Sequence, residues 1–206
     1  GPNALDGQAD FVLYHAVVDN VFTSGNMDYQ HLDYWTARSQ DQYVDGATMV
    51  PFVGSHDVPR FTSRADTGTA DAWNQWVEDG LPGQPGNDDP YLSALQAHTW
   101  LLTTPGAPAI YQGDEYGEFG GADPDNRHIL RTTSELNERE NSLMENISAI
   151  GQLRMMQNAQ IQPGLIPLSS EQEEGLADIL SFAQNIFGGM ADTRDGFAGD
   201  IGGERN

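Results

Sequence analysis

Two short segments of the sequence combine a carboxylate with a histidine or an arginine. The first places His56 and Asp57 on adjacent residues after an apolar run, and the second, residues 120–127, contains Asp123 and Arg127. Carboxylate and guanidinium groups offer several directed hydrogen-bonding positions, which suits the recognition of hydroxyl groups. Residue types alone leave alternatives open. His56 and Asp57 equally fit a turn in which Asp57 caps the next helix, and Asp123 to Arg127 fits a turn closed by a salt bridge.

The elements that must position these residues alternate between short apolar runs and helical patterns. Residues 11–22 suggest a strand end that enters a helix, and residues 47–53 and 107–111 are brief apolar runs of the kind found in buried parallel strands. Apolar residues at helical spacing predict helices over 91–104 and 137–157. The strand, helix, strand order is typical of an α/β fold with parallel strands. Polar residues just beyond strand ends are the arrangement from which (β/α)8 barrels build their active sites.

Two further segments complete this pattern. Residues 26–46 carry aromatic and leucine residues at spacings that suit a short helix packed on something larger. Residues 61–90 are dominated by Gly, Pro, Asp, Thr and Asn, which predicts a loop much longer than ordinary connections. Loops of that length usually carry function or are disordered.

The amino-acid composition argues against some classes of binding partner. The 206 residues include 31 acidic side chains and nine basic ones, all arginine, which gives a net charge of −22. Such a charge repels phosphate backbones and anionic lipids, so we expect no nucleic-acid and no membrane partner. Solubility, or adaptation to high salt, explains the charge more simply than an acidic binding face does. Calcium binding is compatible with the negative charge, but no spacing of ligand residues indicates a metal site. The lack of cysteine excludes disulfides and thiolate chemistry.

Four segments resemble motifs of the α-amylase superfamily of glycoside hydrolases. Phe52-Val-Gly-Ser-His-Asp-Val-Pro-Arg60 is similar to the motif Phe-x-x-Asn-His-Asp-x-x-Arg at the seventh barrel strand, with Ser55 in place of the usual asparagine. Residues 105–117 resemble the eighth-strand motif and residues 120–127 the loop that follows it. Residues 9–14 resemble the sixth strand. The segments occur in the family's order and roughly its spacing, and the resemblance extends from about residue 5 to residue 187.

The resemblance implies an α/β fold that is a partial (β/α)8 TIM barrel. Residues 1–158 would supply the last three βα units, and residues 159–206 would begin an all-β C-terminal domain. Complete barrels need about 250 residues, so the earlier units are expected before Gly1. The opening Gly-Pro-Asn-Ala fits a processing or fragment boundary rather than a translation start.

The same resemblance implies a retaining mechanism for cleaving α-glucosidic bonds. An aspartate nucleophile and a glutamate general acid would lie on two strands expected upstream, so this chain alone would be inactive. Asp57 matches the third catalytic carboxylate, which favours ring distortion as positive charge develops at the anomeric carbon. His56 would donate a hydrogen bond to the sugar at the cleavage subsite. Asp123 and Arg127 match positions that hold glucose units on the non-reducing side of the scissile bond.

The expected substrate is a starch-like α-glucan or a maltooligosaccharide, with hydrolysis as the default over transglycosylation or isomerisation. A complete protein of this kind is expected to be a monomer and to lie outside the cell or in the periplasm. Two other functions are open. A catalytically inactive relative could bind glucan or a partner protein, which Ser55 slightly favours, and an acidic calcium-binding module would lack catalysis altogether.

Overall fold

The computed structural model describes residues 6–43, 47–66, 71–74, 76 and 80–161. The chain divides into two compact units, residues 1–151 and residues 152–206. All the described elements lie in the first unit, except for the end of the last helix, Glu138–Ile161. Residues 159–161 form the end of that helix, so the β domain predicted from residue 159 does not begin there; the rest of its predicted range, 162–206, lies outside the described residues.

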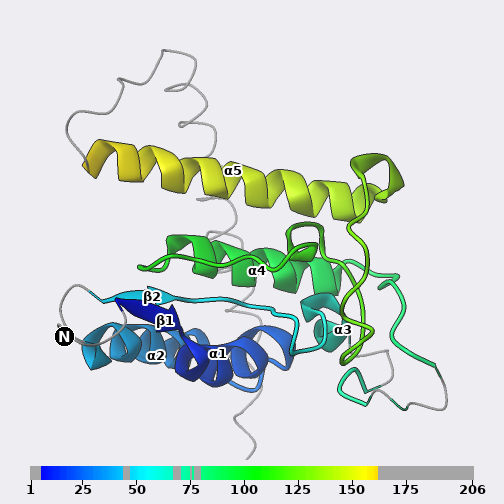
Figure 1. Ribbon diagram of the computed structural model, residues 1–206, viewed down its shortest axis with the longest axis horizontal. Helices are drawn as coiled ribbons and strands as arrows, with labels where there is room; N and C mark the ends of the chain where they lie inside the picture. Colours follow the sequence, from blue (N-terminus) through cyan, green and yellow to red (C-terminus); the bar gives the residue numbers. More distant parts are fainter. Residues whose placement is uncertain (1–5, 44–46, 67–70, 75, 77–79, 162–206) are drawn as a thin grey trace, which may run out of the picture. The chain divides into compact units, whose positions relative to one another are not determined.

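Short strands and helices alternate along the described chain (Figure 1). In chain order the elements are β1 (Gly7–Ala9), α1 (Phe11–Val17), the π-helical turn η1 (Val18–Thr23), α2 (Tyr29–Gln42), β2 (Thr48–Val50), α3 (Phe61–Ala65), α4 (Asp89–Thr103), the 3₁₀ turns η2 (Asp114–Tyr116) and η3 (Thr133–Glu135), and α5 (Glu138–Ile161). The fold is therefore α/β, as the sequence predicts.

Two parallel strands form the sheet. β1 pairs with β2, and Gly7 lies opposite Thr48. A Cβ atom at Gly7 would lie 1.8 Å from the carbonyl oxygen of Thr48, so the close approach of the strands requires glycine at this position.

The strand predicted to continue beyond Ala9 ends there instead. Asp10 is the N-cap of α1, and its carboxylate accepts a hydrogen bond of 3.0 Å from the amide of Leu13. This cap satisfies a free amide of the first helical turn, so the helix begins directly at Phe11. The prediction that strand residues extend into 9–14 was wrong for this reason.

A third parallel segment joins the sheet through a single bridge between Phe52 and Ala109. The strand predicted over 107–111 is therefore shorter than expected. Pro108 has no amide hydrogen, which limits the ladder that this segment can form. Pro51 fits the sheet because only its carbonyl is used, and it accepts a hydrogen bond of 2.9 Å from the amide of Ala109.

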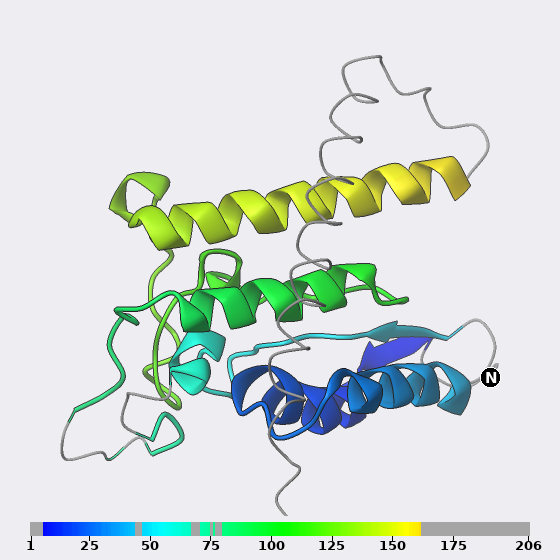
Figure 2. The same ribbon diagram turned by 180° about the vertical axis from the view of Figure 1, so that it is seen from behind.

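The strands lie between helices. Two opposite views agree that α1 and α2 lie on one side of the strands and α4 on the other (Figures 1 and 2). One buried cluster joins α1, η1, α3 and α4 to α5, which contributes Leu143, Ile147 and Ile150. Burial of these apolar side chains is the main stabilising term of the unit.

The loop predicted over 61–90 contains the short helix α3 at its start. Phe61, Thr62, Ser63 and Ala65 are all buried, so this one-turn helix is packed against the core rather than exposed. The helices predicted from apolar spacing are confirmed, with α2, α4 and α5 within a few residues of their expected bounds. Among the described residues, no helix is long and apolar enough to cross a bilayer.

Candidate active site

His56 and Asp57 lie on an exposed turn between the end of β2 and α3. Their side chains are 63% and 61% exposed, and His56 Nε2 lies 3.2 Å from Asp57 Oδ1. The turn is closed locally, since the amide of Asp57 donates to Ser55 Oγ at 3.2 Å. The two side chains are thus available to a ligand while their backbone is fixed by the turn.

Asp57 does not cap the helix that follows. The N-cap residue of α3 is Arg60, and no side chain accepts a hydrogen bond there. The interpretation of Asp57 as a capping residue is therefore wrong. Its carboxylate has no capping role that would explain its place on this turn.

Asp123 and Arg127 form an exposed ion pair on the second segment. Arg127 Nε lies 2.8 Å from Asp123 Oδ1, and the side chains are 49% and 53% exposed, respectively. The segment is a compact turn, because the amide of Asp125 donates to the carbonyl of Ala122 and Asp125 Oδ2 accepts from the amide of Gly121. The salt-bridged turn considered from the sequence is therefore present, and its two charged groups remain accessible.

Asn126 joins the two segments. Its side chain is fully buried, and Nδ2 donates to the carbonyls of His56 and Val58, both at 2.8 Å. The two accepting carbonyls lie on either side of Asp57. Residues separated by about seventy positions in the sequence are therefore held together by one amide group.

Backbone contacts reinforce this junction. The amide of Arg60 donates to the carbonyl of Gly120 at 3.0 Å, and the amide of Gly120 donates to Ser63 Oγ at 2.9 Å. Gly120 has a φ of 149°, and a Cβ there would lie 2.6 Å from the carbonyl oxygen of Asp125. Glycine is therefore required where the second segment folds back against the first.

A buried ion pair joins Arg60, which lies just before α3, to Asp114, the first residue of η2. Arg60 Nη1 is 3.1 Å from Asp114 Oδ1, and both side chains are 1% exposed. Burial raises the pKa of Asp114 to about 6, although the charge and hydrogen bond of Arg60 oppose this rise. Arg60 Nη1 also donates to the carbonyl of Gln112 at 2.6 Å, and its guanidinium lies 4.3 Å from the ring centroid of Tyr111.

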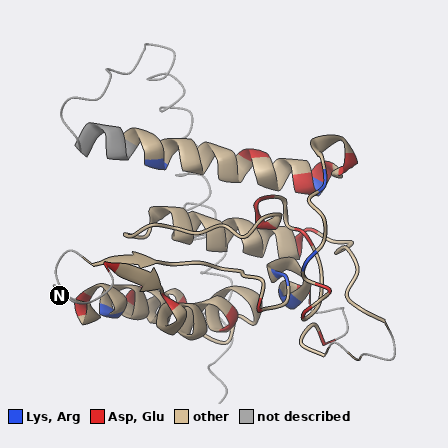
Figure 3. Cartoon of the chain, in the orientation of Figure 1, with Lys and Arg blue, Asp and Glu red and all other residues tan. Residues whose placement is uncertain are grey.

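A second charged network anchors the end of the loop to α5. Arg131 contacts Glu118 and Glu140, whose side chains are 2% and 0% exposed. Burial alone would raise the pKa of Glu118, but hydrogen bonds from His128 and Arg131 hold it below its ordinary value. Figure 3 shows that arginine and acidic positions gather around α3 and the loops that follow it. Ion pairing therefore fixes both ends of the loop that carries Asp123 and Arg127.

Sequence reasoning missed Asn126, the Arg60–Asp114 pair and the Arg131 network. The arginine and acidic residues involved lie far apart in the sequence, so no spacing rule pairs them. Asn126 looks like an ordinary turn residue because it follows Pro124 and Asp125. Only its complete burial and its two carbonyl partners identify its role.

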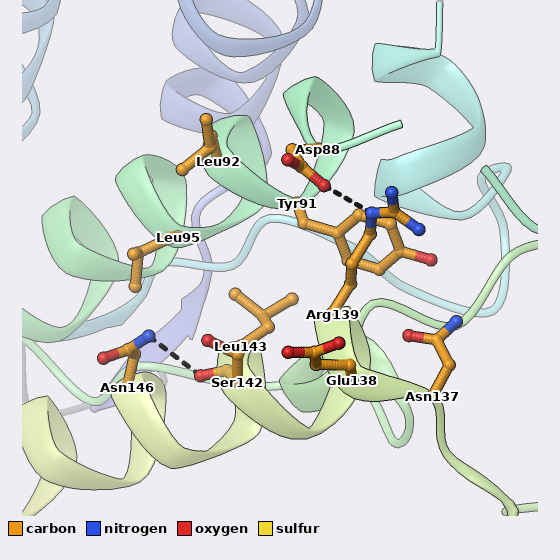
Figure 4. A pocket seen from close by; sticks show the side chains of 10 residues that line it. All are labelled: Asp88, Tyr91, Leu92, Leu95, Asn137, Glu138, Arg139, Ser142, Leu143 and Asn146. Atoms are coloured by element: carbon orange, nitrogen blue, oxygen red, sulfur yellow. Dashed lines mark hydrogen bonds and ion pairs between the residues drawn. The ribbon is translucent and has the colours of Figure 1, made fainter. Parts of the chain in front are cut away.

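A groove of about 620 Å³ lies elsewhere in the first unit, between the starts of α4 and α5 (Figure 4). Leu92 and Leu95 form part of its wall, and Arg139 reaches across it to Asp88. None of the four site residues predicted from the sequence lines it. In the described part of the chain, no group of three or more His, Cys, Asp or Glu side chains is arranged to hold a metal ion.

Comparison with known proteins finds relatives that are named as an amylase and as a glycosyl hydrolase. A Beta/alpha-amylase of Paenibacillus polymyxa is 36% identical over 127 residues, which cover 61% of this chain. An uncharacterized glycosyl hydrolase of Schizosaccharomyces pombe is 28% identical over 133 residues, or 63% of this chain. The resemblance to the α-amylase superfamily is confirmed. The aligned parts span only 9% and 22% of the lengths of these two proteins. No family model matches the chain.

Solved structures of α-amylase superfamily enzymes share the fold. An Anoxybacillus α-amylase aligns with a TM-score of 0.58 at 23% identity, covering 77% of this chain and 30% of that enzyme. The α-amylase of Geobacillus thermoleovorans complexed with acarbose gives 0.56 at 24% identity, covering 75% and 29%. The cyclic α-maltosyl-(1→6)-maltose hydrolase of Arthrobacter globiformis complexed with maltose gives 0.58 at 22% identity, covering 78% and 31%. At these identities the likeness concerns the fold.

Proposed function

We propose that this chain is part of a retaining glycoside hydrolase that cleaves α-glucosidic bonds in starch-like glucans or maltooligosaccharides. The observation that carries the proposal is the junction made by Asn126, which brings the turn of His56 and Asp57 against the segment of Asp123 and Arg127. Both segments resemble α-amylase motifs. Their junction in space is what a shared sugar-binding site requires.

The exposed polar groups suit a neutral sugar. The carboxylates of Asp57 and Asp123 accept hydrogen bonds from hydroxyl groups, while Arg127 and His56 donate them. A neutral polyol is not repelled by the net charge of −22, whereas an anionic substrate would be. The names of the relatives, an amylase and a maltosyl hydrolase among them, support a glucan rather than another class of sugar.

The proposed role of Asp57 is electrostatic. As the glycosidic bond breaks, positive charge develops at the anomeric carbon, and a fixed carboxylate stabilises that charge more than it stabilises the ground state. His56 and Asp57 contact each other, so the imidazole also orients the carboxylate. The nucleophile and the general acid are proposed to lie on two strands that precede this chain, within a barrel whose last three βα units the chain supplies.

The proposed location follows from the size of the proposed substrate. Because that substrate is a polymer or a long oligosaccharide, we place the enzyme outside the cell or in the periplasm. We propose that it is a monomer with no nucleic-acid and no membrane partner. The all-β domain is proposed to begin after Ile161, the last residue of α5.

The test is an assay of reducing-sugar release from soluble starch. The protein is the polypeptide that carries this chain together with the segment proposed to precede it. Replacing Asp57 by Asn should lower kcat by at least about 10²-fold, because a preorganised charge is lost from the transition state. Asp33→Asn, which changes an exposed aspartate of α2, is the matched control and should leave kcat unchanged. Starch that is bound but never cleaved would instead support an inactive binding protein.

A further inference from the structure

The side chain of Asn126 makes contacts that a turn residue does not need. It is fully buried, and its amide nitrogen donates to the carbonyls of His56 and Val58 at 2.8 Å each. Its own Oδ1 is buried, and no group of the described residues donates a hydrogen bond to it. A buried polar atom without a partner costs free energy, so the position is not optimised for stability alone.

The orientation of this amide is fixed by its surroundings. Exchanging the nitrogen and oxygen would place Oδ1 against the two carbonyl oxygens, where it would be repelled. Both amide hydrogens of Asn126 are therefore committed to the backbone around Asp57. No other uncharged side chain of similar shape offers two hydrogens from one planar nitrogen at that reach.

We propose that Asn126 is a positioning residue for Asp57. The peptide groups on both sides of Asp57 are held by one rigid amide, so the Cα of Asp57 is fixed while its exposed carboxylate projects toward solvent. Asn126 directly precedes Arg127, which is paired with Asp123. The same residue therefore sets the place of Asp57 relative to the proposed sugar-binding pair. The kinetic effect expected of Asn126 rests on the proposed function, whereas its effect on the backbone around Asp57 does not.

The effect of Asn126 on the backbone around Asp57 can be measured on this chain without an assay of enzyme activity. In Asn126→Asp the new carboxylate faces two carbonyl oxygens and cannot bridge them, and in Asn126→Ala both carbonyls lose their donor. NMR relaxation should show the backbone order parameters of residues 56–58 falling from about 0.85 to below about 0.6 in both variants. Two variants are used so that a folding failure of the charged one does not remove the test.

A matched control exists at the start of α5. The side-chain amide of Asn141 also donates to two carbonyls, those of Leu136 and Asn137, at 3.1 and 3.0 Å. Asn141→Asp removes the same chemistry far along the chain from Asp57. It should leave the order parameters of residues 56–58 unchanged.

The kinetic consequence separates positioning from general stability. In the longer polypeptide, displacement of a catalytic group by about 1 Å can lower the rate about 10²-fold, so we expect kcat to fall about 10- to 100-fold in Asn126→Ala. KM for maltoheptaose should change by less than about threefold, because uniform binding is retained. A merely structural role would lower the folded fraction and leave the kcat of the folded enzyme unchanged.

The outcomes distinguish this inference from the proposed function. Unchanged order parameters at residues 56–58 in both Asn126 variants would overturn the positioning role, whatever the enzyme does. An active wild-type enzyme whose kcat per folded molecule is unaffected by Asn126→Ala would also overturn it. An inactive wild-type polypeptide would count against the proposed function, while the relaxation measurement would still decide the role of Asn126.

Discussion

Replacing Arg60 by methionine removes the positive half of a buried ion pair. Arg60 and Asp114 are each 1% exposed, so neither charge is well solvated once its partner is lost. Breaking a buried pair from one side typically costs about 3–5 kcal/mol, because the remaining charge is uncompensated. We expect the free energy of unfolding to fall by that amount in Arg60→Met. The carbonyl of Gln112 loses a donor in the same change.

The loss should depend on pH in a defined direction. Burial already raises the pKa of Asp114 from 3.8 to about 6 against the attraction of Arg60, so removing Arg60 raises it further. A group with a raised pKa in the folded state contributes its full stability below its unfolded pKa and loses it as pH rises through the folded pKa. The difference between wild type and Arg60→Met should therefore be larger at pH 8 than at pH 5, where the carboxyl is increasingly neutral.

Urea denaturation followed by circular dichroism measures this difference at both pH values. Arg139→Met is the matched control, because Arg139 pairs with Asp88 where the side chains are 42% and 72% exposed. An exposed pair contributes about 0–1 kcal/mol. Equal losses in the two variants would refute the reasoning. If Arg60→Met loses more unfolding free energy at pH 5 than at pH 8, Asp114 is not the group responsible for the pH dependence.

Two further predictions concern charge. Arg131→Met leaves Glu118 and Glu140 buried without their shared partner, so the free energy of unfolding should fall by about 3–5 kcal/mol. Because the pKa of Glu118 is lowered in the folded state, its contribution is present above its unfolded pKa and lost in acid, so the deficit should shrink when denaturation is repeated near pH 3. The net charge of −22 predicts that the melting temperature rises between 0.05 and 1 M NaCl, as the screening length shortens to about 3 Å. A flat melting temperature over that range would contradict the role assigned to self-repulsion, and an uncharged osmolyte such as sucrose separates screening from preferential exclusion.

The long helices could be predicted because apolar residues repeat at helical spacing over many turns. Leu143, Ile147 and Ile150 illustrate this, since all three are buried in α5. The short elements could not be predicted in the same way. The cap at Asp10 starts a helix where apolar residues suggested strand, and α3 has too few residues to show a period.

Only the turns of the candidate site could be predicted from the sequence. His56 and Asp57, like Asp123 and Arg127, lie on turns, but their roles at a sugar-binding site stay a prediction, and the groups that hold the turns do not follow from any local pattern. Asn126 acts through atoms of residues about seventy positions away, and Arg60 is paired with an acid more than fifty positions away. Such contacts depend on the tertiary arrangement and leave no periodic signal in the sequence.

The most direct test of the proposed hydrolase is the anomeric form of the first product. Maltoheptaose is incubated with the longer polypeptide that carries this chain, and the released reducing end is observed by proton NMR before mutarotation. A retaining α-glucosidase mechanism releases the α-anomer first, and Asp57→Asn should abolish that signal. Release of the β-anomer first would contradict the retaining mechanism, and bound but intact maltoheptaose would contradict catalysis itself.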